Sequence, residues 1–299
     1  FPPPAGFQPL NAANVRPETV ITRPDHYVGV TTYTGTGAAQ KITGLNFKSD
    51  LIWVKARQAY NHRLWDSVRG FGSGKALYPD EPSSMGTNSS NDGVISTDID
   101  GWTFTTTGAR VNDANNYVGW AWKAGGSKNT FNVDDVGYAS AAAAGLDGGA
   151  VNPTGASVGT KQGFSIILQS CTLYADSVSS HGLSQTPNFI ISKNKAAAGQ
   201  WDVYHSGLTS GKRIRLNQTT AEFTPNFSNT DSSMKSVSSS TFTFVANSGG
   251  GNDIIHYIWH DVPGLQKFGS YIGNANADGP LSLIHISEPT RLGMSSYAV

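Results

Sequence analysis

Two histidines, His256 and His260, stand four residues apart, a spacing that on a helix would present two imidazoles to one metal ion. Their segment, "NDIIHYIWHD", is instead typical of a β-strand, because branched and aromatic residues dominate it. Four residues of a strand span about 13 Å, whereas zinc holds its nitrogen ligands at about 2 Å. We therefore predict no metal site, and we expect histidines such as His62 and His205 to cap backbone groups at strand ends.

Paired carboxylates are the second candidate, since glycan hydrolysis uses two acids about 5–10 Å apart. Asp98 and Asp100 in "STDIDGW" share one side of a predicted turn, and their D-x-D-G pattern supplies only part of a calcium loop. Asp66 and Asp202 each follow a tryptophan directly. We predict turns at all four acids and keep three alternatives: calcium binding by the first pair, glycan cleavage by the first pair, and glycan cleavage by the second.

Nucleophile and phosphate motifs are incomplete. The letters G-x-S-x-G occur once, in "GASVG" at 155–159, inside the segment predicted to be a Gly/Ala-rich linker and so without the strand–helix context of a nucleophile elbow. The single cysteine, Cys171, stands in a predicted strand, which favours a small core residue and excludes an intrachain disulfide. "GFGSGKAL" at 70–77 resembles the end of a phosphate-binding loop without its full pattern. We therefore predict a protein that is not an enzyme and needs no cofactor.

The composition favours strands joined by turns over helices, because Gly (34 residues), Ser, Thr and Asn are abundant and Glu is scarce. Charged residues make up 14%, with Lys+Arg equal to Asp+Glu at 21 each. Such a surface predicts no binding to nucleic acid or to an anionic membrane. No apolar stretch reaches the roughly 20 residues of a membrane helix. Because the chain begins "FPPPAGFQPL" without Met, we expect it to be part of a longer protein.

A pattern repeated at an offset near 137 residues divides the chain. "DLIWVKAR" at 50–57 matches "NFIISKNK" at 188–195, and "SGK" occurs at 73–75 and 210–212. Further pairs keep the same order, namely Trp65-Asp66 with Trp201-Asp202, Trp102 with Phe242, and Trp122 with Trp259. Several matches in one order predict an internal duplication.

Each copy holds several short segments typical of strands, separated by Gly-rich turns. We predict an all-β protein of two tandem antiparallel β-sandwiches, with one sandwich interleaved from both copies as the alternative. The expected domains are a linker at 1–26, repeat 1 at 27–124, a Gly/Ala-rich linker at 125–162, repeat 2 at 163–265, the start of a truncated third repeat at 266–281, and a tail at 282–299.

Aromatic residues are the candidate structural core. On the alternating segment 117–122, the face with Trp120 and Trp122 corresponds to the face with Tyr257 and Trp259 in repeat 2. Bulky residues persist on this face, so we predict that it lines the sandwich core, with sugar stacking by Trp122 or Trp259 as the alternative. The whole candidate set is Trp53, Trp65, Trp102, Trp120, Trp122, Trp201, Tyr257 and Trp259.

The ordered set "DLIWVKAR", "DGWTF", "YVGWAWKAGG", "GFSIILQS" and "FGSYIGNANADGP" resembles a repeated domain of tail-fibre-like structural proteins from tailed, often marine, phages. "PPPAGFQPLNAANVRPETVI" resembles the linker that follows a SPRY-like domain in those proteins. The resemblance covers about residues 1–281 and departs at Trp259, where those proteins carry Cys or Phe. The tail "SLIHISEPTRLGMSSYAV" resembles translated sequencing adapter from a metagenomic assembly.

The resemblance implies a virion protein, either a tail fibre or a surface protein, that serves as a spacer or as a host-surface, glycan-binding module. The implied partners are other virion proteins, a host-surface glycan and further copies of the chain in a homo-oligomer. Two alternatives stay open, a glycan depolymerase and a bacterial lectin or adhesin.

Overall fold

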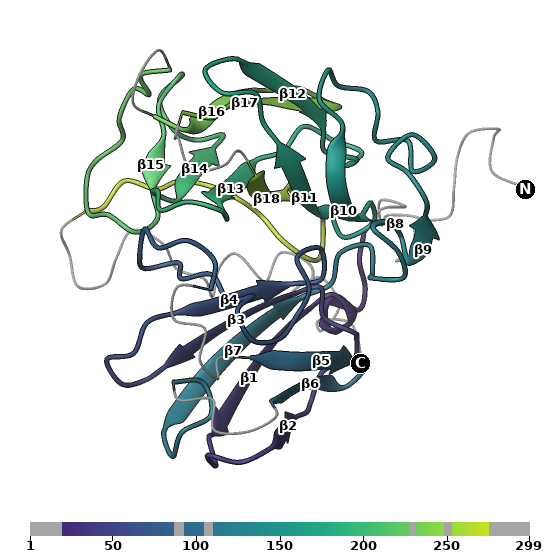
Figure 1. The fold of residues 1–299 in the computed structure, drawn as a ribbon, viewed down its shortest axis with the longest axis vertical. Coiled ribbons are helices and arrows are strands. Elements are labelled where there is room, and N and C mark those ends of the chain that lie inside the picture. Colours follow the sequence, from purple (N-terminus) through teal and green to yellow (C-terminus); the bar gives the residue numbers. More distant parts are fainter. Residues whose placement is uncertain (1–19, 87–92, 105–109, 228–230, 248–252, 275–299) are drawn as a thin grey trace, which may run out of the picture. The chain divides into compact units, whose positions relative to one another are not determined.

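A computed structural model of the protein describes residues 20–86, 93–104, 110–227, 231–247 and 253–274. Within these ranges the chain forms eighteen β-strands and one 3-10 turn, η1 (Pro24–His26) (Figure 1). The strands build several sheets, and nearly all neighbouring strands are antiparallel. The predicted all-β class with sandwiched antiparallel sheets is therefore confirmed.

Repeat 1 consists of two small sheets. The first has the strand order β1 (Val28–Thr34), β7 (Asn116–Trp122), β3 (Leu51–Ala56) and β4 (Arg63–Asp66). The second has the order β2 (Gln40–Ile42), β6 (Gly101–Phe104) and β5 (Val94–Asp98). One buried cluster between them contains Trp65, Trp102, Tyr117 and Ala121, so these sheets enclose the core of this repeat.

Repeat 2 uses the same plan and extends it. Its large sheet has the order β15 (Ile214–Arg215), β14 (Asp202–His205), β13 (Phe189–Asn194), β18 (Asp253–Trp259), β11 (Phe164–Ser170), β10 (Pro153–Gly159), β8 (Phe131–Val133) and β9 (Val136–Tyr138). Its small sheet has the order β12 (Asp176–Ser180), β17 (Thr241–Val245) and β16 (Ser233–Val237). The run β11-β18-β13-β14 reproduces β1-β7-β3-β4, and β12-β17-β16 reproduces β2-β6-β5.

Strand register defines which residues of the two repeats are counterparts, meaning that they hold the same position in equivalent strand pairs. Leu51 pairs with Trp122 as Phe189 pairs with Trp259. The irregularity in β5 between Val94 and Ser96 recurs in β16 between Met234 and Ser236. Such an irregularity inserts a residue and bends a strand, so its recurrence is detailed evidence for one duplicated module.

The register corrects one part of the sequence alignment. Val54 pairs with Arg63, and its counterpart Ser192 pairs with Asp202. Asp202 is therefore the counterpart of Arg63, and Asp66 is the counterpart of His205. The matching of Trp65-Asp66 with Trp201-Asp202 is wrong by three residues, because the repeated letters lie at different strand positions.

The segment 125–162, expected to be a linker, instead contains β8, β9 and β10. Strand β10 pairs with β11 and joins this hairpin to the large sheet of repeat 2 (Figure 1). Its small residues fit close backbone contacts. A Cβ on Gly125 would lie 2.4 Å from backbone atoms of Val158, and Ser157 Oγ accepts the N–H of Gly125 at 2.9 Å. The abundance of glycine here thus reflects tight packing as well as turns.

The predicted core face of β7 is also wrong. Tyr117, Gly119 and Ala121 are buried on the sandwich side, whereas Trp120 and Trp122 are half-buried on the other face. Strand β18 shows the same arrangement, because Ile254 and Ile258 belong to the core between the sheets of repeat 2 while Tyr257 and Trp259 belong to a different cluster. The bulky face that the two repeats share therefore packs against residues outside its own sandwich.

At one position the two cores fill the same space with different combinations of a small and a large side chain. Gly119 of β7 leaves room for the Trp102 indole, whose Cη2 and Cζ2 atoms would lie 2.7 Å from an added Cβ. In repeat 2 the counterpart of Gly119 is His256, which contacts the smaller Phe242 ring at 4.7 Å. A glycine with an indole and a histidine with a phenyl ring fill the same place, as a closely packed interior requires.

The two repeats belong to one compact unit that ends at Phe268, and a second unit begins at Gly269. In the second unit the described residues 269–274 contain no strand. The rest of the expected third-repeat start, 275–281, and the tail 282–299 lie outside the described residues, as do residues 1–19 of the N-terminal linker.

Candidate functional site

The sheet β1-β7-β3-β4 of repeat 1 and the large sheet of repeat 2 each have one face that points away from their own sandwich, and these two faces pack against each other. We call the buried residues between them the junction cluster: Leu51, Leu64, Leu77, Ala124, Phe164, Ile166, Ile191, Trp201, Val203, Ile255, Tyr257 and Trp259. Leu64 and its counterpart Val203 are both members. Like the interface of a two-fold symmetric dimer, the junction joins equivalent surfaces, and this burial explains why the face stays bulky in both repeats.

Aromatic pairs line the junction. Trp122 contacts its own counterpart Trp259 edge to face, with ring centroids 6.4 Å apart and an interplanar angle of 68°. Trp259 also stacks on Phe164 at 4.6 Å. Such pairs contribute about 0.5–1.5 kcal/mol beyond the area they bury. Trp122 and Trp259, which were predicted to line a sandwich core, thus hold the two repeats together.

The predicted aromatic residues fall into three locations. Trp65 and Trp102 are fully buried in the core of repeat 1. Trp201, Tyr257 and Trp259 belong to the junction cluster, against which the half-buried Trp53 and Trp122 pack. Trp120 is half-buried and contacts Trp53 at 6.4 Å.

An apolar cavity of about 320 Å³ opens at the junction. Its walls include Trp53, Trp122, Phe189, Trp259, Gln266 and Phe268. The amide of Gln266 already donates to the carbonyls of Gln162, Gly163 and His260. The cavity therefore offers aromatic surface with little hydrogen bonding, which suits an apolar group better than a sugar.

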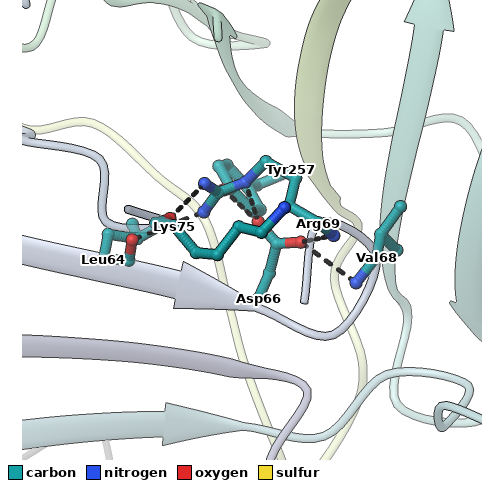
Figure 2. A network of polar contacts seen from close by, with 6 residues as sticks. All are labelled: Leu64, Asp66, Val68, Arg69, Lys75 and Tyr257. Atoms are coloured by element: carbon teal, nitrogen blue, oxygen red, sulfur yellow. Dashed lines mark hydrogen bonds and ion pairs between the residues drawn. The ribbon is translucent and has the colours of Figure 1, made fainter. Parts of the chain in front are cut away.

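A buried polar network crosses the junction (Figure 2). Tyr257 of repeat 2 donates its hydroxyl to Asp66 Oδ2 of repeat 1 at 2.6 Å. Arg69 Nε donates to the same oxygen at 2.6 Å, and both side chains of this ion pair are at most 1% exposed. The other oxygen, Oδ1, accepts the N–H groups of Val68 and Arg69. Both oxygens of Asp66 therefore have hydrogen-bond partners, and the residue has a structural role.

Arg69 is the residue that sequence reasoning missed. Its guanidinium also donates to the carbonyls of Lys75 and Leu64, at 2.6 and 3.3 Å. Burial raises the pKa of Tyr257 well above its ordinary value, so its hydroxyl stays a donor. The available signal was the spacing of Asp66 and Arg69 in "WDSVRG", which allows a local ion pair in a turn.

Asp66 and Asp202, the alternative catalytic pair, lie in separate environments. Asp202 is buried between the sheets of repeat 2, where it accepts the Ser233 hydroxyl and the N–H of Met234. Burial raises the pKa of Asp202 to about 6, although these hydrogen bonds oppose the shift. Asp66 belongs to the junction network described above, so the two acids do not share a site.

The other candidate residues have structural partners. His256 is buried in repeat 2 and its Nδ1 lies 2.8 Å from Ser192 Oγ, while His260 follows the strand. Asp98 Oδ1 accepts the N–H of Asp100 in a turn, and Lys41 pairs with Asp98 at 2.9 Å. Among the residues that the structure describes, no group of three or more metal-binding side chains exists.

His62, His205 and Cys171 also have clear surroundings. His205 Nδ1 accepts the N–H of Gly207 at 2.8 Å, as a backbone-capping histidine does. His62 Nδ1 instead accepts the indole N–H of Trp53 at 2.9 Å. Cys171 is buried, which raises the pKa of its thiol to about 12 and disfavours the reactive thiolate.

The fold and the junction define a duplicated all-β protein whose two sandwiches join through equivalent faces. The chain belongs to the family described as a domain of unknown function (DUF7483), whose model matches residues 23–284 and so spans both repeats. Neither the curated proteins nor the solved structures compared with it include a match. Within the described ranges, no helix is long and apolar enough to cross a membrane.

Proposed function

We propose that the protein is a non-enzymatic structural component of a phage virion, a tail fibre or surface protein, in which the two repeats act as one stiff spacer. The junction is the observation that carries this proposal. Tyr257 donates a buried hydrogen bond to the ion-paired Asp66, and the loss of such a bond costs about 1–3 kcal/mol, so separating Tyr257 from the Asp66–Arg69 pair is unfavourable. Interfaces between domains of one chain usually permit relative motion, and this network opposes it.

Hydrogen bonds to backbone carbonyls strengthen the junction. Trp201 Nε1 of repeat 2 donates to the carbonyl of Tyr78 in repeat 1 at 2.8 Å. The N–H of Gly199 donates to the carbonyl of Pro82 at 2.7 Å, and the N–H of Met85 donates to the carbonyl of Lys195 at 2.9 Å. These bonds fix one repeat on the other in orientation as well as distance. A stiff two-repeat unit transmits load along a fibre without bending at its centre.

The proposal includes contact with other virion proteins, with further copies of the chain and with a host-surface glycan. It rests for these partners on the resemblance to tail-fibre-like proteins. A glycan depolymerase and a bacterial lectin or adhesin are the competing functions. Immunogold labelling of purified phage particles separates them by location, since label on tails or particle surfaces is expected and label confined to bacterial cells would contradict the proposal.

Mechanical unfolding of single molecules tests the spacer role. We expect both repeats of the natural chain to unfold in one cooperative event, because unfolding of one repeat exposes the junction face of the other. A variant with Tyr257→Phe and Arg69→Met should unfold in two events. Two events in the unmodified chain would overturn the stiff spacer. A parallel assay for new reducing ends on host capsule would reveal depolymerase activity and thereby contradict the non-enzymatic assignment.

A further inference from the structure

A polar cavity of about 310 Å³ lies between the two sheets of repeat 2, away from the junction network. Its lining includes Ser192 of β13, Asp202 of β14, Arg215 of β15, Phe244 of β17 and the loop residues Gln200 and Asp231. Small-molecule sites are typically about 300–1,000 Å³. This cavity is at the lower end of that range and therefore suits a single small ring.

The same place is filled in repeat 1. Asp202 pairs with Arg215, and the equivalent positions there hold Arg63 and Tyr78. Arg63 and Tyr78 are fully buried, with the guanidinium carbon 4.3 Å from the centre of the Tyr78 ring, and Tyr78 belongs to the core. Ser192 likewise replaces the apolar Val54. One copy of the module has a packed core where the other has an open polar cavity.

The carboxylates of the cavity are held in place and keep capacity to accept hydrogen bonds. Asp231 Oδ1 pairs with Arg215 at 2.6 Å, and its Oδ2 accepts the N–H of Asn226 at 2.8 Å. The two oxygens of Asp202 accept from Ser233 and Met234. A carboxylate oxygen has two lone pairs, so each can accept another donor.

One wall of the cavity is braced by repeat 1. Buried Lys193 donates from Nζ to the carbonyl of Gly199, a lining residue, at 2.9 Å. The same ammonium donates to the carbonyl of Pro82 in repeat 1 at 3.0 Å, and Pro82 also accepts the N–H of Gly199. The loop that contains Gly199 is thus held in place by repeat 1, which reduces the entropic cost of ordering it when a ligand binds.

An unsatisfied amide adjoins this wall. The N–H of Asn247 donates to the hydroxyl of Ser232, another lining residue, at 2.9 Å. Neither polar atom of the Asn247 side chain has a hydrogen-bond partner among the residues that the structure describes, although the residue is only 8% exposed. Buried polar groups are nearly always paired, but Asn247 is not itself a lining residue, so its amide lies next to the cavity and the lining side chains carry the site.

We propose that this cavity of repeat 2 binds one ring of a saccharide. Hydroxyl groups both donate to carboxylates and accept from guanidinium or amide groups, and the lining offers both kinds. A cation would compete with Arg215 for Asp231, and an anion would meet two acids, so a neutral ligand fits best. The inference rests on the glycan-contact part of the proposed function and assigns that contact to a site.

Saturation-transfer NMR on the full chain tests it, with D-glucose, D-galactose, N-acetyl-D-glucosamine and L-rhamnose as separate probes at millimolar concentration. At least one sugar should receive saturation. Arg215→Ala and Asp231→Ala should each weaken its binding at least about tenfold, the effect of one lost charge-assisted hydrogen bond. Arg215→Tyr, which copies repeat 1, should abolish it. Lys235→Ala is the matched control, since it removes an exposed ion pair with Asp176 and should leave binding unchanged.

Thermal melting of each variant establishes that it is folded before binding is compared. Binding of none of the four sugars, or equal binding by the natural chain and Arg215→Tyr, would overturn the site. Release of reducing ends from an oligosaccharide containing the bound sugar would also overturn it as a purely recognising site. Immunogold labelling of phage particles does not depend on these results, so loss of the cavity proposal leaves the virion proposal standing.

Discussion

Trp122 and Trp259 are counterparts in a duplicated module, and they touch each other edge to face at 6.4 Å. A residue meets its own equivalent only near a two-fold axis. Around this contact the two copies associate as a symmetric dimer would, although one chain carries both. Farther away the symmetry is incomplete, because Ile166 is buried in the junction while its counterpart Val30 is 60% exposed. Divergence has made the contact unequal, because Trp259 is 5% exposed and stacks on Phe164, while Trp122 is half-buried.

This inequality predicts unequal mutational costs. Trp259→Ala should lower the free energy of unfolding by about 3–5 kcal/mol, the usual cost of truncating a large buried aromatic side chain. Trp122→Ala should cost about half as much or less, since part of the indole already contacts water. Urea denaturation followed by circular dichroism measures both values. Equal losses would mean that the two indoles are buried alike.

The exchange of volume between the repeats predicts a compensating pair. Gly119→Ala should destabilise the protein by about 1–3 kcal/mol, because its methyl group would lie 2.7 Å from the Trp102 indole. Trp102→Phe should recover part of that loss, since repeat 2 combines the larger His256 with Phe242. A double-mutant cycle measures the coupling. Purely additive effects would show that the two side chains do not compete for space.

The polar network predicts a specific role for one hydroxyl group. Tyr257→Phe removes the donor to Asp66 and should lower stability by about 1–3 kcal/mol, because it withdraws a buried hydrogen bond from a carboxylate. Tyr174→Phe is the control, since Tyr174 is 58% exposed and its change should stay within about 0.5 kcal/mol. Denaturation midpoints compare the two variants. Similar small effects for both would indicate that the Asp66–Arg69 pair needs no third partner.

Buried histidines predict a loss of stability in mild acid. Burial lowers the pKa of His256 to about 3 and that of His181 to about 4, against 6.5 in the unfolded chain. Below pH 6.5 the unfolded chain therefore binds protons that the folded chain refuses, which lowers stability by about 1.4 kcal/mol per pH unit and histidine. Asp202 acts oppositely, because its raised pKa of about 6 lets the folded chain bind a proton first.

Variants separate these contributions. Between pH 6 and 4, His256→Phe should reduce the slope of the unfolding free energy against pH by about 1.4 kcal/mol per pH unit, which corresponds to one bound proton. Asp202→Asn should make the slope steeper by about the same amount. Urea titrations at a series of pH values provide the slopes independently of each variant's absolute stability. Slopes identical to that of the natural chain would place the titrating groups elsewhere.

Strand positions and the duplication could be predicted because branched and aromatic residues alternate in segments such as Leu51–Ala56 and recur at a constant offset. The surface that packs against the bulky face could not be predicted. Constant volume at Trp122 and Trp259 indicates that a face is buried, but a second repeat buries it as well as an opposing sheet does. Likewise, a matching Trp-Asp pair at 65–66 and 201–202 carries no information on register, which hydrogen bonding sets.

Strand β10 was missed for a different reason. Its residues are mostly small, "PTGASVG", yet nearly all of them are buried. Propensity rules treat Gly and Ser as turn or linker residues, whereas here Ser157 and Gly125 allow backbones to approach closely. The polar cavity of repeat 2 could not be predicted either. It exists because Asp202 and Arg215 stand where repeat 1 has Arg63 and Tyr78, and only the strand register identifies these residues as counterparts.

The self-matching junction also limits how such modules can be strung together. A patch that is complementary to its own copy is used up as soon as two copies meet, and here both patches are consumed inside one chain. Any additional module in a longer protein would have to find a twin of its own or attach through different surfaces. The two joined repeats would then be the unit of length, and further copies would be added to it through other surfaces.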